Sequence, residues 1–400
     1  MKKIYFDNCL TSKTDKKVVT EMIPYFTEKY YFPENFVSIG TQASSDIDKS
    51  KKIIADSLNV DKSEIHFTTG GTSANNLAIK GFLTANSNKG THIICSIIDY
   101  PDILTNASFF EKSGFEVTYL SADWDGRINL EELKAALRPD TVLFMTTLSN
   151  HTMGTIQDMP KIKEILSTSD HHIYTHVDAC EAYARMHIDP KEMGIDMMSI
   201  SAHKIHGPQG IGALYLRKGI NLGQIKHGID RIDRYETGGI SVALIAGFAK
   251  AVELAFDNLD EKIAYMRNLS NHLLERVQNE IPHIIVNGAI GEERICHNMN
   301  ISFSFIEGEA ITVMLDLMNI NVATGSACAS KGLKANYILM GTGRTHEQSH
   351  GSIKFTFSRF NTIEEVDYTV DKLKEIVQTL RERSPLYTDY KNQIKENKGE

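Results

Sequence analysis

One cysteine of the chain lies in a segment whose side chains are too small to pack around it. Cys328 stands in "TGSACAS", residues 324–330, among glycine, serine and alanine. The thiolate form of cysteine is a strong nucleophile, and a loop of small residues could present it to a second group. An ordinary linker with a chance cysteine would have the same pattern. Other motifs of the chain have to separate these two interpretations.

Three polar motifs each follow a run of β-forming residues. In "TTGGTSANNLAIKG", Gly71 and Thr72 come where a helix begins; its free N–H groups favour a phosphate, although an ordinary strand–helix turn also fits. In "HVDACEA", Asp178 ends an apolar strand, either as a helix N-cap or as the counter-ion of a protonated ring nitrogen. In "SISAHKIHGPQG", Lys204 is either a surface lysine or a buried amine of lowered pKa that forms a Schiff base.

As a set, these three motifs match what pyridoxal 5'-phosphate (PLP) requires of a protein. The cofactor needs a cup for its phosphate, a carboxylate for its pyridinium nitrogen and a lysine for its aldehyde. Gly71 and Thr72, Asp178 and Lys204 supply these groups in that order along the chain. The joint occurrence therefore favours a PLP site more strongly than any single motif does.

The elements that must position these motifs alternate between two periodicities. Short β-rich runs lie at 64–69, 91–96, 115–122, 141–149, 172–179, 196–202 and 212–217. Helix-like segments such as 129–137 and 159–168 lie between most of them. This alternation predicts an α/β fold with a mostly parallel sheet flanked by helices, and ligands in such sheets bind at the carboxyl ends of the strands. We expect this large PLP-binding domain to span residues 15–255.

Beyond residue 256 the pattern changes to that of a smaller α+β unit. A long amphipathic stretch at 261–281 leads into strands, and the segment 362–383 has one apolar face with helical spacing. We expect residues 1–14 and 256–400 to form a small α+β domain that carries the Cys328 loop.

Composition and charge narrow the class of protein. Hydrophobic residues make up 42% and charged residues 24%, as in soluble globular proteins, and the net charge of -8 argues against a nucleic-acid partner. We expect no signal peptide and no membrane association, since no apolar run approaches the ~20 residues of a span. The five scattered cysteines contain no CxxC pair or Cys/His cluster, so we expect no metal site and a reducing cytoplasmic location.

With these motifs in place, the sequence resembles the class V aminotransferase-fold enzymes, and among them the cysteine desulfurases of the nitrogen-fixation and iron–sulfur-cluster type. The similarity runs from "YFDN" near the start to "SRFNTIEEVDY" near the end. It implies a PLP-dependent transferase of fold type I, a homodimer with PLP near the subunit interface. The implied reaction converts L-cysteine to L-alanine and leaves a persulfide on Cys328, for iron–sulfur assembly or thiolation through a sulfur-acceptor protein.

The resemblance also implies a role for each matching residue. Lys204 would bind the cofactor aldehyde, Cys328 would take the sulfur, and Thr237 would reach the phosphate of the neighbouring subunit. The implied cofactor-binding residues are Gly71, Thr72, Tyr100, His151, Asp178, Glu181, Ser201, His203 and Thr237.

Four positions depart from the pattern of the family, all at the cofactor or substrate. Tyr100 replaces a histidine over the ring, and a phenol with an ordinary pKa near ~10 is a poor base. Lys354 replaces the arginine that binds the substrate carboxylate, which keeps the charge but loses the bidentate fork. His151 replaces an asparagine and Glu181 a glutamine, both near the phenolic oxygen of the cofactor. We hypothesise that a protonated His151 pairs with Glu181 there, because a lone carboxylate would be repulsive.

Three functions stay open on the sequence alone. The first is the cysteine desulfurase just described. The second is a PLP-dependent C–S or C–Se lyase that acts on a different or modified cysteine substrate; the four departures favour it and the Cys328 loop disfavours it. The third is a catalytically degenerate scaffold or sulfur-relay protein, which the retention of Lys204 and Asp178 disfavours.

Overall fold

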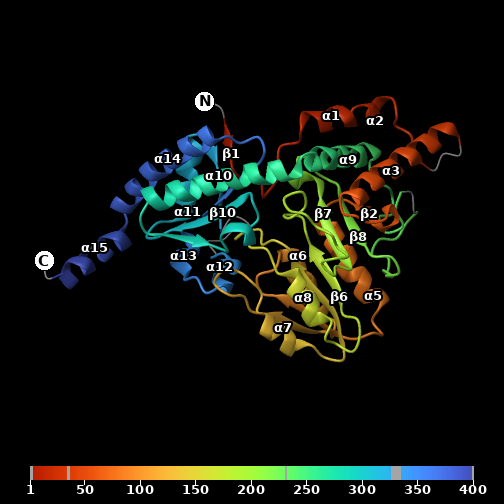
Figure 1. Cartoon of the computed structure of the whole chain (residues 1–400), viewed down its shortest axis with the longest axis horizontal. Coiled ribbons are helices and arrows are strands. Elements are labelled where there is room, and N and C mark those ends of the chain that lie inside the picture. The colour runs from red at the N-terminus through yellow and green to blue at the C-terminus, as the bar shows by residue number, and fades with distance from the viewer. Residues whose placement is uncertain (1–2, 34–36, 230–231, 326–334, 399–400) are drawn as a thin grey trace.

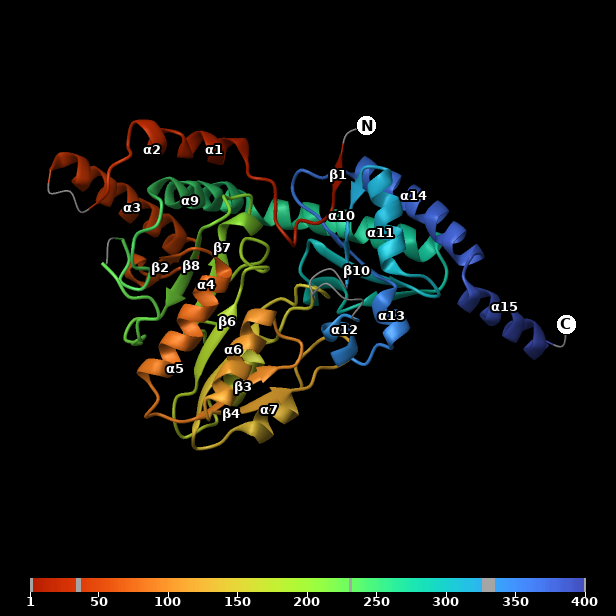
Figure 2. The ribbon, with the colours of Figure 1, turned by 180° about the vertical axis from the view of Figure 1, so that it is seen from behind.

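The computed structural model describes residues 3–33, 37–229, 232–325 and 335–398 (Figure 1). Cys328 lies outside these residues. The elements gather in two parts, and the helices α9 (Val242–Phe256) and α10 (Leu259–Glu280) run one after the other from the larger part to the smaller (Figures 1 and 2).

The larger part is built on a seven-stranded sheet. The strand order is β2-β8-β7-β6-β5-β3-β4; β8 pairs antiparallel with both neighbours and all the other pairs are parallel. The strands are β2 (Ile65–Thr68), β3 (His92–Ser96), β4 (Glu116–Leu120), β5 (Thr141–Thr147), β6 (Tyr174–Asp178), β7 (Met197–Ser201) and β8 (Gly212–Leu216). The predicted α/β fold with a mostly parallel sheet is therefore confirmed.

Helices cover both faces of this sheet, so its strands are apolar along most of their length. Neighbouring residues of one strand belong to different cores: Ile94 lies in one, and Ile93 and Cys95 lie in the other. The core of Ile94 is closed by α1 (Lys16–Met22), α3 (Ser38–Asp56), α7 (Leu130–Ala136), α8 (Met159–Leu166) and α9. The opposite core is closed by α4 (Gly71–Asn76), α5 (Phe82–Ala85) and α6 (Pro101–Lys112), with a π-helical turn at Leu77–Gly81 between α4 and α5.

The smaller part has an antiparallel four-stranded sheet of order β12-β13-β10-β9. These strands are β9 (Ile284–Asn287), β10 (Asn298–Phe303), β12 (Ala323–Thr324) and β13 (Ser352–Thr356). Its helices are α10, α11 (Gly308–Leu317), α12 (Tyr337–Gly341), α13 (His346–His350), α14 (Ile363–Glu382) and α15 (Pro385–Lys398). As the sequence pattern predicts, α14 buries one face, with Val366, Val370, Leu373 and Val377 in the core of this part.

The N-terminal segment joins the two parts. The strand β1 (Ile4–Tyr5) pairs in parallel with β11 (Ile320–Asn321) of the smaller part. A few residues later, the Ser12 hydroxyl donates to the carbonyl of His203 at 2.7 Å, next to the end of β7. The chain then enters α1 and the short α2 (Pro24–Thr27). Residues 7–12 therefore cross between the two parts, beside the strand ends where a ligand is expected.

The division into domains at residues 255 and 256 stays a prediction; it falls at the end of α9. None of the helices in the described part of the chain combines the length and apolar character that a membrane span needs. Within the same described ranges, no three His, Cys, Asp or Glu side chains are grouped so that they could hold a metal ion.

Candidate active site

A cavity of about 360 Å³ opens at the carboxyl ends of the strands of the large sheet. Thr147, Asp178 and Ser201 are the last residues of β5, β6 and β7, and all three line it. The predicted site residues that line this cavity are Gly71, Thr72, Tyr100, His151, Asp178, Glu181, Ser201, His203, Lys204 and Lys354. The strand order thus brings together residues that are separated by more than half the chain.

Lys204 forms a buried ion pair with Glu181. The lysine ends a single 3₁₀ turn, η3 (Ala202–Lys204), and its Nζ donates to Glu181 Oε1 at 2.5 Å and also to the carbonyl of Cys9. Burial opposes the charge of Lys204, but Glu181 raises its pKa above the ordinary value. Burial likewise opposes the charge of Glu181, whereas Lys204 holds its pKa well below the ordinary value. Both groups are therefore ionised in this structure.

Asp178 is a buried carboxylate held by neutral donors. Its Oδ2 accepts from Asn75 Nδ2 at 2.8 Å and its Oδ1 accepts from the backbone N–H of Cys180 at 2.9 Å. Burial raises the pKa of Asp178, and these hydrogen bonds offset part of the rise. Behind it, His176 Nε2 lies 3.0 Å from Asn75 Oδ1, which orients the amide. A carboxylate buried in this way favours a cationic group facing it from the cavity.

The start of α4 forms the end of the site where a phosphate is expected. Gly70 has a φ of 148° and Gly71 lies so close to Cys180 that a Cβ would come within 2.6 Å of its Sγ, so both positions need glycine. No side chain caps this helix, which leaves its first N–H groups for a ligand. Ser201 Oγ and His203 Nδ1 lie 2.7 Å apart beside it, and an outer cavity of about 800 Å³ opens over the same turn.

Lys354 lies across the cavity from Lys204, on β13. Its Nζ donates to Cys9 Sγ and to the carbonyl of His151, each at 3.2 Å. Cys9 Sγ in turn donates to that same carbonyl at 3.3 Å. Burial raises the pKa of the Cys9 thiol. Cys9 is therefore a neutral thiol fixed between two cationic side chains.

His151 and Tyr100 meet edge to face, with ring centroids 4.7 Å apart and planes at 74°. Burial, with Lys354 and Lys204 adding to it, lowers the pKa of His151 to about 3. The hypothesis of a protonated His151 paired with Glu181 is therefore wrong for this structure. Glu181 pairs with Lys204 instead, and His151 is neutral because it is buried beside two lysines.

Two predicted residues are not placed in the cavity. Thr237 is half-buried in the loop before α9 and lines neither of the cavities over the strand ends. Its neighbour Glu236 lies nearer, since it accepts a hydrogen bond from Ser73 at 3.2 Å. Cys328 belongs to the segment outside the described residues, so its predicted role is not tested by the geometry.

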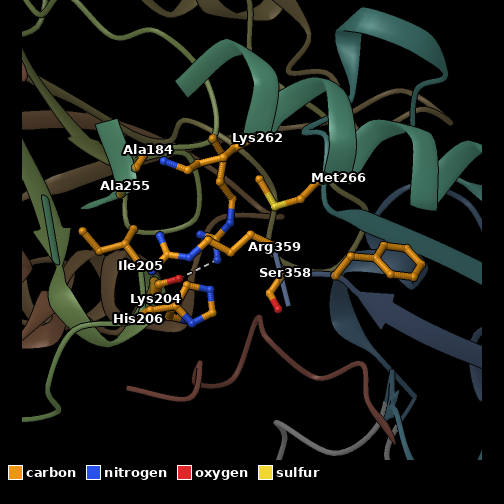
Figure 3. Close-up of a pocket in the computed structure, with 11 residues that line it drawn as sticks. Ala184, Lys204, Ile205, His206, Ala255, Lys262, Met266, Ser358 and Arg359 are labelled. Atoms are coloured by element: carbon orange, nitrogen blue, oxygen red, sulfur yellow. Dashed lines mark hydrogen bonds between the residues drawn. The ribbon is translucent and has the colours of Figure 1, made fainter. Parts of the chain in front are cut away.

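A third and much smaller cavity, of about 30 Å³, lies behind the Lys204 turn (Figure 3). Lys262 and Arg359 line it, together with Arg185, whose Nη2 donates to the carbonyl of Lys204 at 2.6 Å (dashed line in Figure 3). Arg359 also pairs with Asp15 at 2.6 Å. The space suffices for about one or two waters. This side of the turn therefore fixes the backbone of Lys204 and does not receive a substrate.

Three residues of the site are not predicted from the sequence: Cys9, Asn75 and His297. Cys9 directly follows the motif "YFDN", and Asn75 lies in "TTGGTSANNLAIKG". In both cases a polar side chain within or next to a motif is the signal that points to the site. His297 carries no signal in the sequence, because it lies in an unremarkable turn before β10. In the structure its Nε2 lies 3.6 Å from Glu181 Oε2.

Comparisons with known proteins agree with one another. Residues 4–369 match the family described as aminotransferase class-V. A curated relative, cysteine desulfurase IscS of Clostridium botulinum, is 38% identical over 390 residues, 97% of this chain and 98% of that one. The solved structure of a NifS-like protein superimposes with a TM-score of 0.89 at 29% identity, over 95% of this chain and 100% of the other. A structure of SspA in complex with cysteine superimposes with a TM-score of 0.77 at 28% identity, over 90% and 100% of the two chains.

Proposed function

The chain belongs to the class-V aminotransferase family, and we propose that it is a PLP-dependent cysteine desulfurase. It converts L-cysteine to L-alanine and leaves the sulfur as a persulfide on Cys328, for transfer to iron–sulfur assembly or thiolation. The observation that carries the proposal is the single cavity in which a buried lysine, a buried aspartate and an uncapped helix start face one another.

The residues that line the cavity fit PLP. The free N–H groups at the start of α4, with Ser201 and His203 beside them, suit a phosphate. Asp178 is buried and accepts hydrogen bonds from two neutral donors, the Asn75 amide and the Cys180 backbone N–H, which suits a protonated ring nitrogen. Lys204 reaches into the same cavity from the end of β7. When bound, PLP supplies an electron sink for the carbanion that forms at the substrate Cα.

The side chains of this protein hold and move the protons of the reaction. Lys204 removes the Cα proton, for which its amine must first be neutral. Lys354 holds the substrate carboxylate, and the edge-to-face contact with His151 orients the Tyr100 ring, which would stack on bound PLP. The thiolate of Cys328 then attacks the substrate sulfur. The carbon–sulfur bond breaks, a sulfur–sulfur bond forms, and L-cysteine plus the enzyme thiol become L-alanine plus the enzyme persulfide.

A related sulfur amino acid is the second candidate substrate. Lys354 is the group expected to bind the substrate carboxylate. Its amine already donates hydrogen bonds to Cys9 Sγ and to the His151 carbonyl. An arginine in its place would bind the carboxylate through two parallel hydrogen bonds, which a lysine does not do. Without the two parallel hydrogen bonds of an arginine, a longer or differently charged substrate would bind at Lys354 as well as L-cysteine does.

We further propose that the active protein is a cytoplasmic homodimer of two-domain subunits. Exposed apolar side chains on the N-terminal helices, among them Val19, Ile23 and Phe26, support an interface there. In the described part of the chain, Thr237 lines neither of the two cavities over the strand ends, which agrees with a role toward the phosphate of a neighbouring subunit.

The test is to incubate the PLP-loaded protein with L-cysteine, quantify alanine, and locate the persulfide by mass spectrometry. Cys328→Ala is expected to abolish both products, and Cys95→Ala, a core cysteine of β3, is expected to leave them in place. Alanine or pyruvate formed without Cys328 would instead support a lyase. A bound yellow cofactor with no product from any sulfur amino acid would support a scaffold.

A further inference from the structure

His297 is a buried histidine whose ring faces the ion pair of the active site. It is 0% exposed, and neither of its ring nitrogens has a hydrogen-bond partner in the described structure. Glu181 Oε2 is likewise without a hydrogen bond, although Oε1 of the same carboxylate binds Lys204. The two unpartnered atoms, His297 Nε2 and Glu181 Oε2, lie 3.6 Å apart. A shift of about half an ångström would bring them within hydrogen-bonding distance.

Both residues are fixed by their backbones. The carbonyl of His297 accepts from Phe357 N–H at 2.8 Å, directly before β10 begins. The carbonyl of Glu181 accepts from Arg185 Nη1 at 3.2 Å, just after β6. The two side chains therefore approach from different parts of the fold, and their distance is set by tertiary packing.

The groups around this pair decide which of them is charged. The cations near Glu181 are Lys204 and Arg185, and His297 lies beside its second carboxylate oxygen. Cys9, His151, Lys354 and Tyr100 line the same cavity as Glu181 and Lys204. Burial, with Arg185 and Lys204 adding to it, lowers the pKa of His297 to about 3, although Glu181 opposes this. While Lys204 is an ammonium, His297 is therefore neutral.

Lys204 cannot stay an ammonium if it acts as a base or binds an aldehyde carbon, because both steps need its lone pair. Yet the carboxylate 2.5 Å away stabilises the charged form. Removing the proton would also leave Glu181 as a buried anion without its cationic partner, which is strongly unfavourable. The ion pair therefore opposes the chemistry unless a second group compensates for the lost charge.

We propose that His297 takes up a proton when Lys204 loses one, so that Glu181 exchanges one cationic partner for another. One proton leaves Lys204 Nζ and one binds His297 Nε2, and the net charge of the three groups stays zero. His297 is thus a positioning residue, which acts on Lys204 through Glu181. The proposal rests on the proposed function, because the proton exchange has a role in catalysis only if Lys204 reacts as proposed above.

The charge exchange can be measured on the cofactor-free chain, without turnover. The protonation of His297 is read from the ring nitrogen shifts of protein labelled with ¹⁵N-histidine, and the signal that disappears in His297→Asn assigns the residue. In the wild type, His297 is expected to be neutral at pH 5.5. In Lys204→Met and in Lys204→Gln, its pKa is expected to rise by about 3 units, so that it is mostly protonated at pH 5.5.

Two controls separate this exchange from a general change of the fold. His176 is also fully buried, with its pKa lowered to about 3, but its partner is Asn75, so it should stay neutral in every variant. Adding Glu181→Gln to Lys204→Met should return His297 to the neutral form. A His297 that stays neutral in both lysine variants overturns the proposal, as does one that protonates equally without Glu181. Both outcomes concern the cofactor-free chain. The proposed function is tested separately, by the release of alanine from the PLP-bound enzyme.

Discussion

Lys204 Nζ lies 2.5 Å from Glu181 Oε1, and both side chains are at least nine-tenths buried. The expected reactive amine is thus paired with a carboxylate that favours its protonated form. In a low-dielectric cavity this contact is strong, and it dominates the charge state of the whole site.

Replacing that carboxylate should free the amine. We expect Glu181→Gln to lower the pKa of Lys204 by about 1–3 units, because the amide keeps the shape and removes the charge. The measurement is the pH dependence of PLP attachment to Lys204, trapped by borohydride and located by mass spectrometry. Glu64→Gln, a buried carboxylate bound to the Lys218 backbone far from the cavity, should leave the profile in place. An unshifted midpoint in Glu181→Gln would show that Glu181 does not control Lys204.

Removing the lysine should destabilise the cofactor-free protein. At pH 7.5, above the raised pKa expected for His297 in this variant, Lys204→Met leaves Glu181 as a buried unpaired carboxylate, which typically costs about 3–5 kcal/mol in free energy of unfolding. The double variant Lys204→Met/Glu181→Gln should recover most of this loss, since neither charge then remains. Chemical denaturation of the four chains in the cycle gives the coupling, and additive losses would argue against the pair.

The buried histidines should destabilise the protein in mild acid. His151, His176 and His297 are buried and neutral, with folded pKa values lowered to about 3 from an ordinary 6.5. Below pH 6.5 the unfolded chain binds these protons and the folded chain does not, so stability falls as the pH drops toward 3. At pH 5.5 each histidine should cost about 1.4 kcal/mol relative to neutral pH.

Glu181 adds to this loss only at lower pH. Its folded pKa is depressed, so its contribution is present above its unfolded value and is lost as the pH falls below that value. Glu181 therefore contributes little between pH 7.5 and 5.5. Asp99, whose pKa is raised to about 7 by burial, gains a proton in the folded chain over this range and opposes the loss, so the histidine contribution is read from the difference between wild type and variant. His176→Gln should reduce the loss of stability at pH 5.5 by about 1.4 kcal/mol, the contribution of one such site, whereas the exposed His187→Gln should not.

Lys354 should control the binding of the substrate carboxylate. Its Nζ points at the cavity from β13, held by Cys9 Sγ and the His151 carbonyl at 3.2 Å each. We expect Lys354→Met to raise KM for L-cysteine by about tenfold to a hundredfold, the range of a charged hydrogen bond. The surface variant Lys374→Met on α14 should not change KM. If KM stays constant in Lys354→Met, the carboxylate is bound elsewhere.

Asn75 should contribute to cofactor affinity although it does not line the cavity. Its amide donates to Asp178 Oδ2 at 2.8 Å and lowers the pKa of that carboxyl. We expect Asn75→Ala to weaken PLP binding by about tenfold, the value of one hydrogen bond to a charged group. Fluorescence titration of the cofactor-free chain measures it. Asn86→Ala, which removes a buried amide bound to the Phe82 carbonyl, should bind PLP normally.

Much of the fold could be predicted because its signals are local. The runs around Thr68, Asp178 and Ser201 are short, apolar and bounded by turn residues, so strands ending at these points follow from the sequence alone. Parallel strands bring their carboxyl ends to one edge, so the motifs after them were expected to meet. Two expectations about charge are wrong, a lowered pKa for a buried Lys204 and a protonated His151 beside Glu181, because both pKa values depend on burial and on the direct contact of Lys204 with Glu181.

The sequence by itself determined the residue types of the site and the elements that carry them, because both depend on spacing along the chain. Only the tertiary structure decided which charges meet. Cys9 contacts Lys354, which is 345 positions away in the sequence. Glu181 contacts both Lys204 and His297, which come from two different parts of the fold. Contact distance and burial set each pKa here, and neither property is encoded in the neighbours of a residue along the chain.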